Sequence, residues 1–133
     1  MKLFISSYIT YVFLQLISLH QSKPIEQSIA DGEEVYQDFC IQCHLGNGEG
    51  VYGINPPLAN SDYLFDDIDR SIRNVKYGLS GPIIVNGEKY NSVMINNGLD
   101  DEEIADVMNY ILNSWGNKSD EIVTKKRVTG ISE

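Results

Sequence analysis

The chain has 133 residues, with ten Lys and Arg against nineteen Asp and Glu, so its formal net charge is −9 at pH 7. This length allows one domain of ordinary size. An acidic surface makes nucleic acid and anionic lipid poor partners and favours a partner with a positive patch; acidity that only keeps a small domain soluble is the alternative.

The chain begins with an apolar run. Residues 3 to 19 are mostly apolar and follow a single charged residue, Lys2, an order that is typical of a secretory signal peptide. The run is short for a membrane span of ~17–25 residues, so an uncleaved anchor is the alternative. We predict that residues 1–22 form a signal peptide or anchor and that the protein is exported to the periplasm. Membrane association then requires that residues 3–19 are retained.

A flexible linker is predicted over residues 23–30, followed by one domain over 31–117. Asp31 is a candidate N-cap, with Glu34 at the capping-box position. Tyr36 and Phe39 lie at helical spacing behind it. The pattern predicts a helix from about Gly32 into the motif that follows.

Cys40-Ile41-Gln42-Cys43-His44 is a C-x-x-C-H motif, the spacing that attaches a c-type haem. Cys40 and Cys43 can form thioethers with the haem vinyl groups, and the His44 imidazole then becomes the proximal axial ligand. The chain has no further cysteine, and its other histidine, His20, lies beside the N-terminal apolar run.

Three other interpretations of this motif are weaker. A zinc site commonly has two ligand pairs, and a second pair is missing here. A thioredoxin-like pair follows a strand, whereas a predicted helix precedes Cys40. A chance disulfide between Cys40 and Cys43 would close a very short loop and stabilise little.

The middle of the chain alternates loops and helix. Three glycines in residues 46–50 predict a loop, and residues 55–57, Asn-Pro-Pro, predict rigid extended backbone. Apolar residues at helical spacing predict a helix between Ser61 and Gly78, with Asp66 or Asp67 as its cap.

The last third of the chain contains a hairpin, a loop and a helix. Asn-Gly between β-prone residues predicts a hairpin over residues 83–90, followed by a loop that contains Met94. Asp100, with Glu103, caps a helix whose apolar face is Ile104, Val107, Met108, Ile111, Leu112 and Trp115. Residues 118–133 are predicted to be a C-terminal tail with a small basic cluster.

These features together resemble the class I cytochromes c, in particular the small mono-haem c domains of bacteria that are linked to cbb3-type oxidases and nitrite reductases. The resemblance covers about residues 32–117 and rests on Gly32-x3-Tyr36-x3-Cys40, Pro56-Pro57-Leu58-Ala59, Tyr90 to Met94, and Tyr110. It implies an all-α cytochrome c fold: three to four helices around a covalent haem, with one short β-hairpin before the methionine loop. In one respect the chain departs from the family, because Ile95 stands where a proline often follows the ligand methionine.

The resemblance and the residue inventory predict the same iron ligands. His44 is the expected proximal ligand, and Met94 is the expected distal ligand because Met108 lies on the apolar face of a helix. In the resembling proteins a proline carbonyl accepts a hydrogen bond from the proximal histidine. Pro56 is the matching position, with Pro57 beside it.

One covalently bound haem c with both axial positions filled predicts a one-electron carrier, not an enzyme, in or feeding an exported respiratory chain. Its partners are then redox proteins with a cationic docking patch, which would meet an acidic surface formed by Asp62, Asp66, Asp67, Asp69 and residues 100–106. The alternative is a haem enzyme or sensor, peroxidase-like or gas-binding, in which Met94 is off the iron and the distal position is open.

Overall fold

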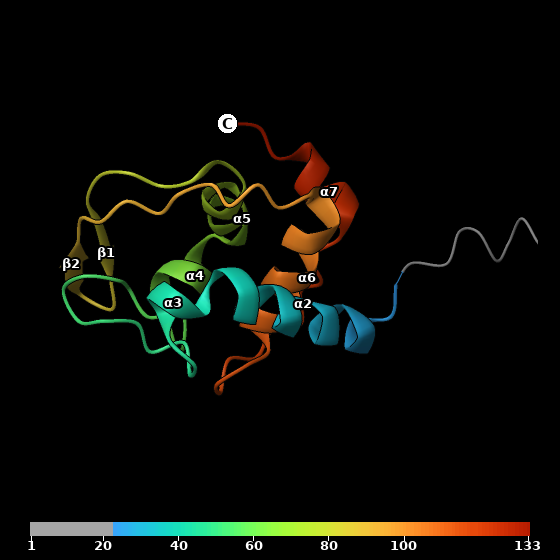
Figure 1. Cartoon of the computed structure of the whole chain (residues 1–133), viewed down its shortest axis with the longest axis horizontal. Helices are drawn as coiled ribbons and strands as arrows, with labels where there is room; N and C mark the ends of the chain where they lie inside the picture. Colours follow the sequence, from blue (N-terminus) through green and yellow to red (C-terminus); the bar gives the residue numbers. More distant parts are fainter. Residues whose placement is uncertain (1–22) are drawn as a thin grey trace, which may run out of the picture.

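The computed structural model describes residues 23–133 (Figure 1). The predicted signal peptide or anchor, residues 1–22, lies outside them. The elements in chain order are α2 (Ile25–Phe39), α3 (Ile41–His44), α4 (Asp62–Asp66), α5 (Ile68–Tyr77), β1 (Ile83–Val85), β2 (Glu88–Tyr90), α6 (Asp101–Leu112) and α7 (Lys125–Gly130). Helices dominate and the two short strands pair antiparallel, so the predicted fold class is confirmed. Over residues 23–133, none of the helices is both long enough and apolar enough to span a bilayer.

The core forms where α2 crosses α6 (Figure 1), and Gly32 of α2 lies against the Asp106 backbone of α6. A Cβ atom at Gly32 would stand only 2.0 Å from the backbone oxygen of Asp106, so any larger residue would push the helices apart. Next to this crossing the ring of Tyr36 packs against Tyr110 at 5.4 Å and Trp115 at 4.9 Å between centroids. The crossing brings the end of α2, and hence the cysteine motif, against the apolar face of α6.

The first helix begins seven residues earlier than predicted. α2 starts at Ile25 with Pro24 at its N-cap position, so the predictions of a linker over residues 23–30 and of an Asp31 cap are wrong. The Asp31 carboxylate instead accepts a hydrogen bond from Gln27, at 2.7 Å, and pairs with Lys23.

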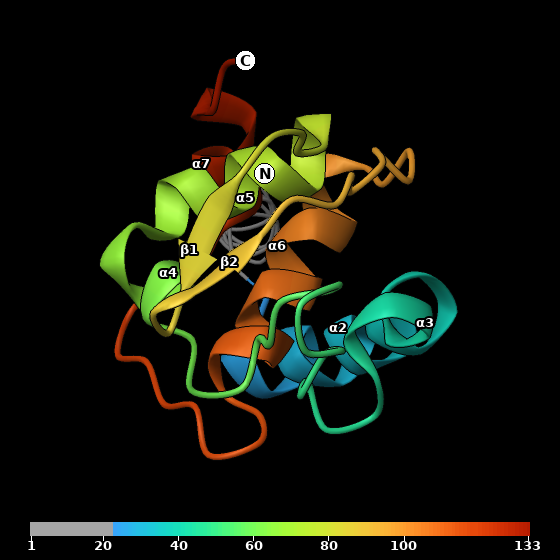
Figure 2. The same ribbon diagram turned by 90° about the vertical axis from the view of Figure 1, so that its left-hand side faces the viewer.

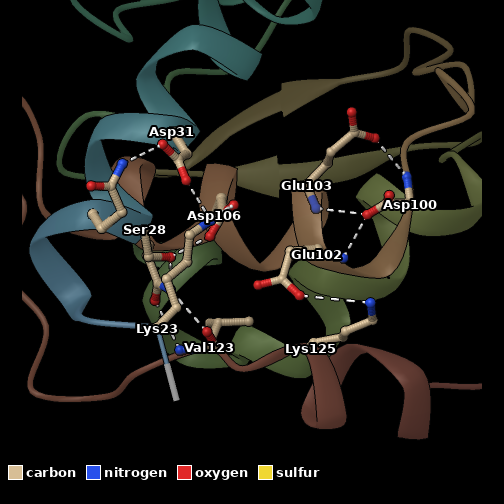
Figure 3. A network of polar contacts seen from close by, with 11 residues as sticks. Lys23, Ser28, Asp31, Asp100, Glu102, Glu103, Asp106, Val123 and Lys125 are labelled. Carbon is tan, nitrogen blue, oxygen red and sulfur yellow. Dashed lines mark hydrogen bonds and ion pairs between the residues drawn. The ribbon is translucent and has the colours of Figure 1, made fainter. Parts of the chain in front are cut away.

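A buried polar network explains this early start (Figure 3). The Ser28 hydroxyl donates to Asp106 at 2.6 Å and accepts from the Asn109 amide at 2.9 Å, while Lys23 Nζ lies 2.6 Å from the other Asp106 oxygen. The first turns of α2 are therefore fixed to α6 by polar groups, which the apolar periodicity of the sequence does not reveal.

The segment between Ser61 and Gly78 forms two helices, α4 and α5, where one was predicted. Ser61 caps α4, and Asp67 caps α5 by accepting a hydrogen bond from the Arg70 amide at 2.8 Å. Gly78 ends α5, as predicted. Because Asp67 caps a new helix within this run of helix-forming residues, the segment forms two helices with separate axes.

The hairpin and the helix after it agree with the sequence. β1 and β2 pair in the register Ile83 with Tyr90 around the Asn-Gly turn, and both turn residues have positive φ, as type I′ turns require. Asp100 and Glu103 form the expected capping box at the start of α6.

The C-terminal tail is more ordered than predicted. After Asn117, the chain returns along α6 and forms α7, which lies near α5 and α6 (Figures 1 and 2). Val123 and Val128 are buried in the same core as α6. Residues 118–133 are thus part of the packed domain, because burial of Val123 and Val128 offsets the polarity of the rest of the segment.

Candidate haem site

The cysteine motif lies where α2 turns into α3. Cys40 ends α2 with its amide bonded to the Tyr36 carbonyl at 2.9 Å, and its own carbonyl accepts from the His44 amide at 3.0 Å. The short helix places Cys40 and Cys43 one turn apart, so both border the same cleft. Helix, not strand, precedes the pair.

The two thiols lie in different surroundings. Cys40 is buried and Cys43 is exposed, and they are not joined to each other. Burial, with a smaller effect of the neighbouring Cys43, raises the pKa of the Cys40 thiol to about 11. Cys40 is therefore an uncharged thiol at neutral pH, which suits the apolar wall beside it.

His44 is buried and has one defined partner. Its Nδ1 lies 2.9 Å from the Pro56 carbonyl oxygen, so the chain uses Pro56 and not the neighbouring Pro57. A carbonyl can only accept, so Nδ1 carries the proton and Nε2 keeps its lone pair. Burial lowers the pKa of His44, while the bond to Pro56 opposes that shift. The neutral ring with a free Nε2 is the form that binds metals.

The space in front of His44 consists of two adjoining cavities. Both are lined by Cys40, His44, Pro56, Leu79, Ile83 and Met94. The larger holds ≈ 390 Å³, within the range of about 300–1,000 Å³ that is usual for cofactor sites. The smaller reaches into the core between α4, α5 and α6, where its lining is mainly aliphatic. An apolar slot that opens beside two thiols and an oriented imidazole fits a haem c.

Met94 faces this space from the loop after the hairpin. It lines both cavities and is only half-buried. Its amide and carbonyl both bond to Leu79, at 2.9 and 2.8 Å, in an isolated bridge. The loop is therefore anchored at the methionine itself, although Ile95 follows it where the family often has proline.

Met108 occupies a different position. It is 1% exposed on α6, within the central apolar cluster, and borders only the smaller cavity. The structure thus places His44 and Met94 on both cavities, whereas Met108 reaches only the inner wall of the smaller one.

The predicted acidic surface is smaller than expected. Asp106 is buried and bonded to Lys23 and Ser28, so its inclusion in an exposed patch is wrong. Among the described residues that line the larger cavity, Asp38 is the one acidic side chain. The carboxylates of α4 and α5 therefore lie outside the lining of this cleft.

The sequence reasoning missed two residues of the site, Gly78 and Leu79. In the sequence, Gly78 predicts only a helix end, and Leu79 carries no signal of its own. A helix stop followed by an apolar residue is too common a pattern to indicate a bridge to a loop fifteen residues away.

Comparison with known proteins agrees with this geometry. The sequence profile of the family described as Cytochrome c matches residues 29–115. Two proteins named cytochrome c-552, both from Thermus thermophilus, are each 45% identical over 92 residues; the match covers 65% of this chain and 70% and 62% of theirs. A cytochrome c subunit of a quinone alcohol dehydrogenase from Gluconobacter oxydans is 34% identical over 107 residues, which cover 74% of this chain but only 22% of that subunit.

The match to the family profile extends over more than half of the chain, from α2 to the end of α6. The half of α2 that carries Gly32 and Tyr36, the cysteine motif and the Met94 loop all lie inside it. The chain belongs to the cytochrome c family, and it is a mono-haem electron carrier with covalently bound haem c.

Proposed function

We propose that Cys40 and Cys43 hold the haem through thioethers and that His44 and Met94 are its two axial ligands. The observation that carries this proposal is the orientation of His44, whose Nδ1 is occupied by Pro56 and whose Nε2 remains available in a cleft that Met94 also lines. When bound, the haem supplies an iron that takes up and releases one electron.

The protein groups then hold the haem, orient its ligand side chains and shield it from water. The Pro56 carbonyl fixes the ring plane of His44 and makes it a stronger donor ligand. The Tyr36 hydroxyl donates to the Leu45 carbonyl at 2.6 Å, which ties the residue after His44 to the helix crossing. With His44 and Met94 both on the iron, no coordination position would remain for a substrate, and the protein would act as a carrier.

This proposal predicts a simple redox titration. Potentiometric titration of the purified holoprotein, followed by its visible spectrum, should give one transition with the slope of a one-electron couple. Peroxide mixed with the Fe(III) form, and carbon monoxide mixed with the Fe(II) form, should each leave the spectrum unchanged. Rapid binding of either would contradict a closed site and support the enzyme or sensor alternative.

The proposal includes an exported location and a positively charged redox partner. The apolar run at residues 3–19 and the need for haem and reduced thiols to meet outside the cytoplasm support export. The net charge of −9 and the exposed carboxylates of Asp62, Asp66 and Asp67 support electrostatic attraction of a cationic docking patch.

Electron transfer to a cationic reagent should therefore slow as salt rises. The rate at which a cobalt(III) tris-phenanthroline cation oxidises the reduced protein should fall as ionic strength rises. Screening limits the range over which these charges attract the cation to ~8 Å at physiological salt. Oxidation by ferricyanide, an anion, should show the opposite trend.

A matched pair of variants tests where the effective charge lies. Asp66→Asn should reduce the salt dependence with the cationic reagent more than Glu26→Gln does. Both remove one exposed carboxylate. Asp66 ends α4, which borders the smaller cavity through Leu64, whereas Glu26 precedes Cys40 by fourteen residues of helix, or roughly 21 Å. Equal effects, or none, would mean that the acidity serves solubility.

A further inference from the structure

The outer face of α5 is fixed to the C-terminal segment, residues 125–132, by polar contacts. Four side chains on one face of the helix make them: Asp69 with Arg127 Nε (2.7 Å), Arg73 with the Ser132 carbonyl (3.0 Å), Lys76 with the Val128 carbonyl (2.9 Å), and Tyr77 with the Ile131 carbonyl (3.0 Å). Lys76 also pairs with Asp101 on α6 at 3.0 Å. The inner face of α5 carries Ile68 and Ile72, which are buried in the core. α5 is therefore held on both sides (Figure 2).

The end of α5 leads directly to Met94. The Gly78 amide closes the helix on the Asn74 carbonyl at 2.9 Å, and the next residue, Leu79, bonds to both backbone groups of Met94. Only one residue separates the last turn of α5 from the bridge. A shift of this helix end must move the backbone of Met94 with it.

Gly78 is also in direct contact with the methionine loop. A Cβ atom at this position would stand 2.8 Å from the Met94 carbonyl oxygen and 3.2 Å from the Asn96 amide nitrogen, and the residue has φ = +87°. Contacts under 3.0 Å with backbone do not occur, so a side chain here must displace the loop. The close approach of α5 to Met94 therefore depends on glycine.

We infer that Gly78 and Leu79 are positioning residues for the distal ligand, and that the C-terminal segment steadies them through α5. This inference rests on the proposed role of Met94 as an iron ligand. The bridge at Leu79 fixes the loop at the methionine, which is the function that a proline after the methionine would otherwise share. The C-terminal segment then acts on the haem site without lining it: among its described residues, none borders either cavity.

The first test compares two glycines. Gly78→Ala should abolish the weak red absorbance band that marks methionine on Fe(III) haem c, and should lower the reduction potential. Gly81→Ala is the matched control, because Gly81 also has a positive φ, +94°, but its Cβ would meet no atom of the described chain within 4 Å. The control should keep the band. Retention of the band in both variants would overturn the inference.

The second test keeps α5 intact and loosens its outer face. Lys76→Met and Tyr77→Phe each remove a contact with the C-terminal segment, whereas Lys125→Met removes an exposed pair with Glu102, at 3.7 Å, that does not involve α5. Heating the Fe(III) holoprotein gives two temperatures: the one at which the red band is lost and the one at which circular dichroism shows unfolding. In the first two variants the band should be lost at a lower temperature than in the wild type, and the gap between the two temperatures should be wider. Lys125→Met should leave that gap unchanged.

The results separate the two levels of the argument. A wild-type protein without the red band would show that Met94 is not a ligand, and the proposed function would fail first. A wild-type band that Gly78→Ala leaves intact would overturn the positioning role alone. So would a gap between loss of the band and unfolding that Lys76→Met, Tyr77→Phe and Lys125→Met all change equally. If Gly78→Ala does not fold, the heating series still decides.

Discussion

With Met94 as the proposed distal ligand, Met94→Ala should leave an iron that is high-spin or bound by water or a lysine such as Lys89. The red band of the Fe(III) form should vanish. The reduction potential should fall, because the thioether that favours Fe(II) is lost. Reactivity with peroxide should rise, since a coordination position opens. Visible spectroscopy, potentiometry and a peroxidase assay measure the three effects on one sample.

The structure supplies a reason why this variant should stay folded. Met94 is half-buried in a loop, and both of its hydrogen bonds to Leu79 are made by backbone atoms that alanine keeps. The helices and the crossing at Gly32 are not touched. A spectral change without loss of helicity therefore reports on the iron and not on the fold.

Met108→Ala is the matched control for this experiment. Met108 is fully buried among the apolar residues of α6, so its truncation should cost ~2–5 kcal/mol of unfolding free energy through a core cavity. The red band and the potential should stay. If the two variants behave the other way round, Met108 is the ligand. If neither changes the spectrum, the result supports the alternative, an enzyme or sensor with an open distal position.

The parts of the fold that were predictable are those where one local pattern determines the structure. The capping box at Asp100 and Glu103 and the Asn-Gly turn are decided within four residues, and both form as expected. The C-x-x-C-H motif likewise places its two cysteines and its histidine through one turn of helix. Such signals require no knowledge of what packs against them.

The parts that were not predictable depend on partners far away in the sequence. The first turns of α2 are held by Asp106 and Asn109, about eighty residues later, through Ser28. A serine on the buried face breaks the apolar period, so the pattern indicates a linker. The C-terminal segment is similar, since its contacts with α5 are mostly side chain to backbone carbonyl, and no sequence pattern encodes an acceptor that every residue carries.

At the candidate site the same distinction applies. The candidate ligands are a matter of residue type and could be named from the sequence; their role as iron ligands stays a prediction. The choice of Pro56 over Pro57 depended on the resemblance, and the geometry at Nδ1 is what distinguishes the two carbonyls. The bridge between Leu79 and Met94 joins two loops and has no periodicity of its own, so only the structure reveals it.

The second large effect is expected at the cysteines. Cys43→Ser should weaken or abolish stable covalent haem attachment, and so should Cys40→Ser. Haem staining after denaturing electrophoresis measures this directly, because only a covalent haem remains with the chain. Gln42→Ser is the control: Gln42 lies between the cysteines and borders the same cleft, but it offers no thiol, so its variant should keep the haem.

The two cysteine variants differ in a way that separates attachment from folding. Cys43 is exposed, so a serine there costs the polypeptide little by itself. Cys40 is buried against the apolar core, where a serine hydroxyl must also find a hydrogen-bond partner. Cys40→Ser should therefore lower stability more than Cys43→Ser even when neither holds haem.

Loss of the haem should also unfold much of the domain. The cavity wall includes Leu64, Val75, Val85 and Ile111, which would lose their largest apolar neighbour. A domain of this size buries too little apolar surface elsewhere to compensate for that loss. A group that binds only the native state stabilises it, and that contribution disappears with the group. We expect the Cys40→Ser, Cys43→Ser double variant to show reduced helicity and a broad thermal transition by circular dichroism. A haem-free double variant with native helicity and a sharp transition would mean that the crossing of α2 and α6, with the C-terminal segment packed on it, is a sufficient core without the cofactor.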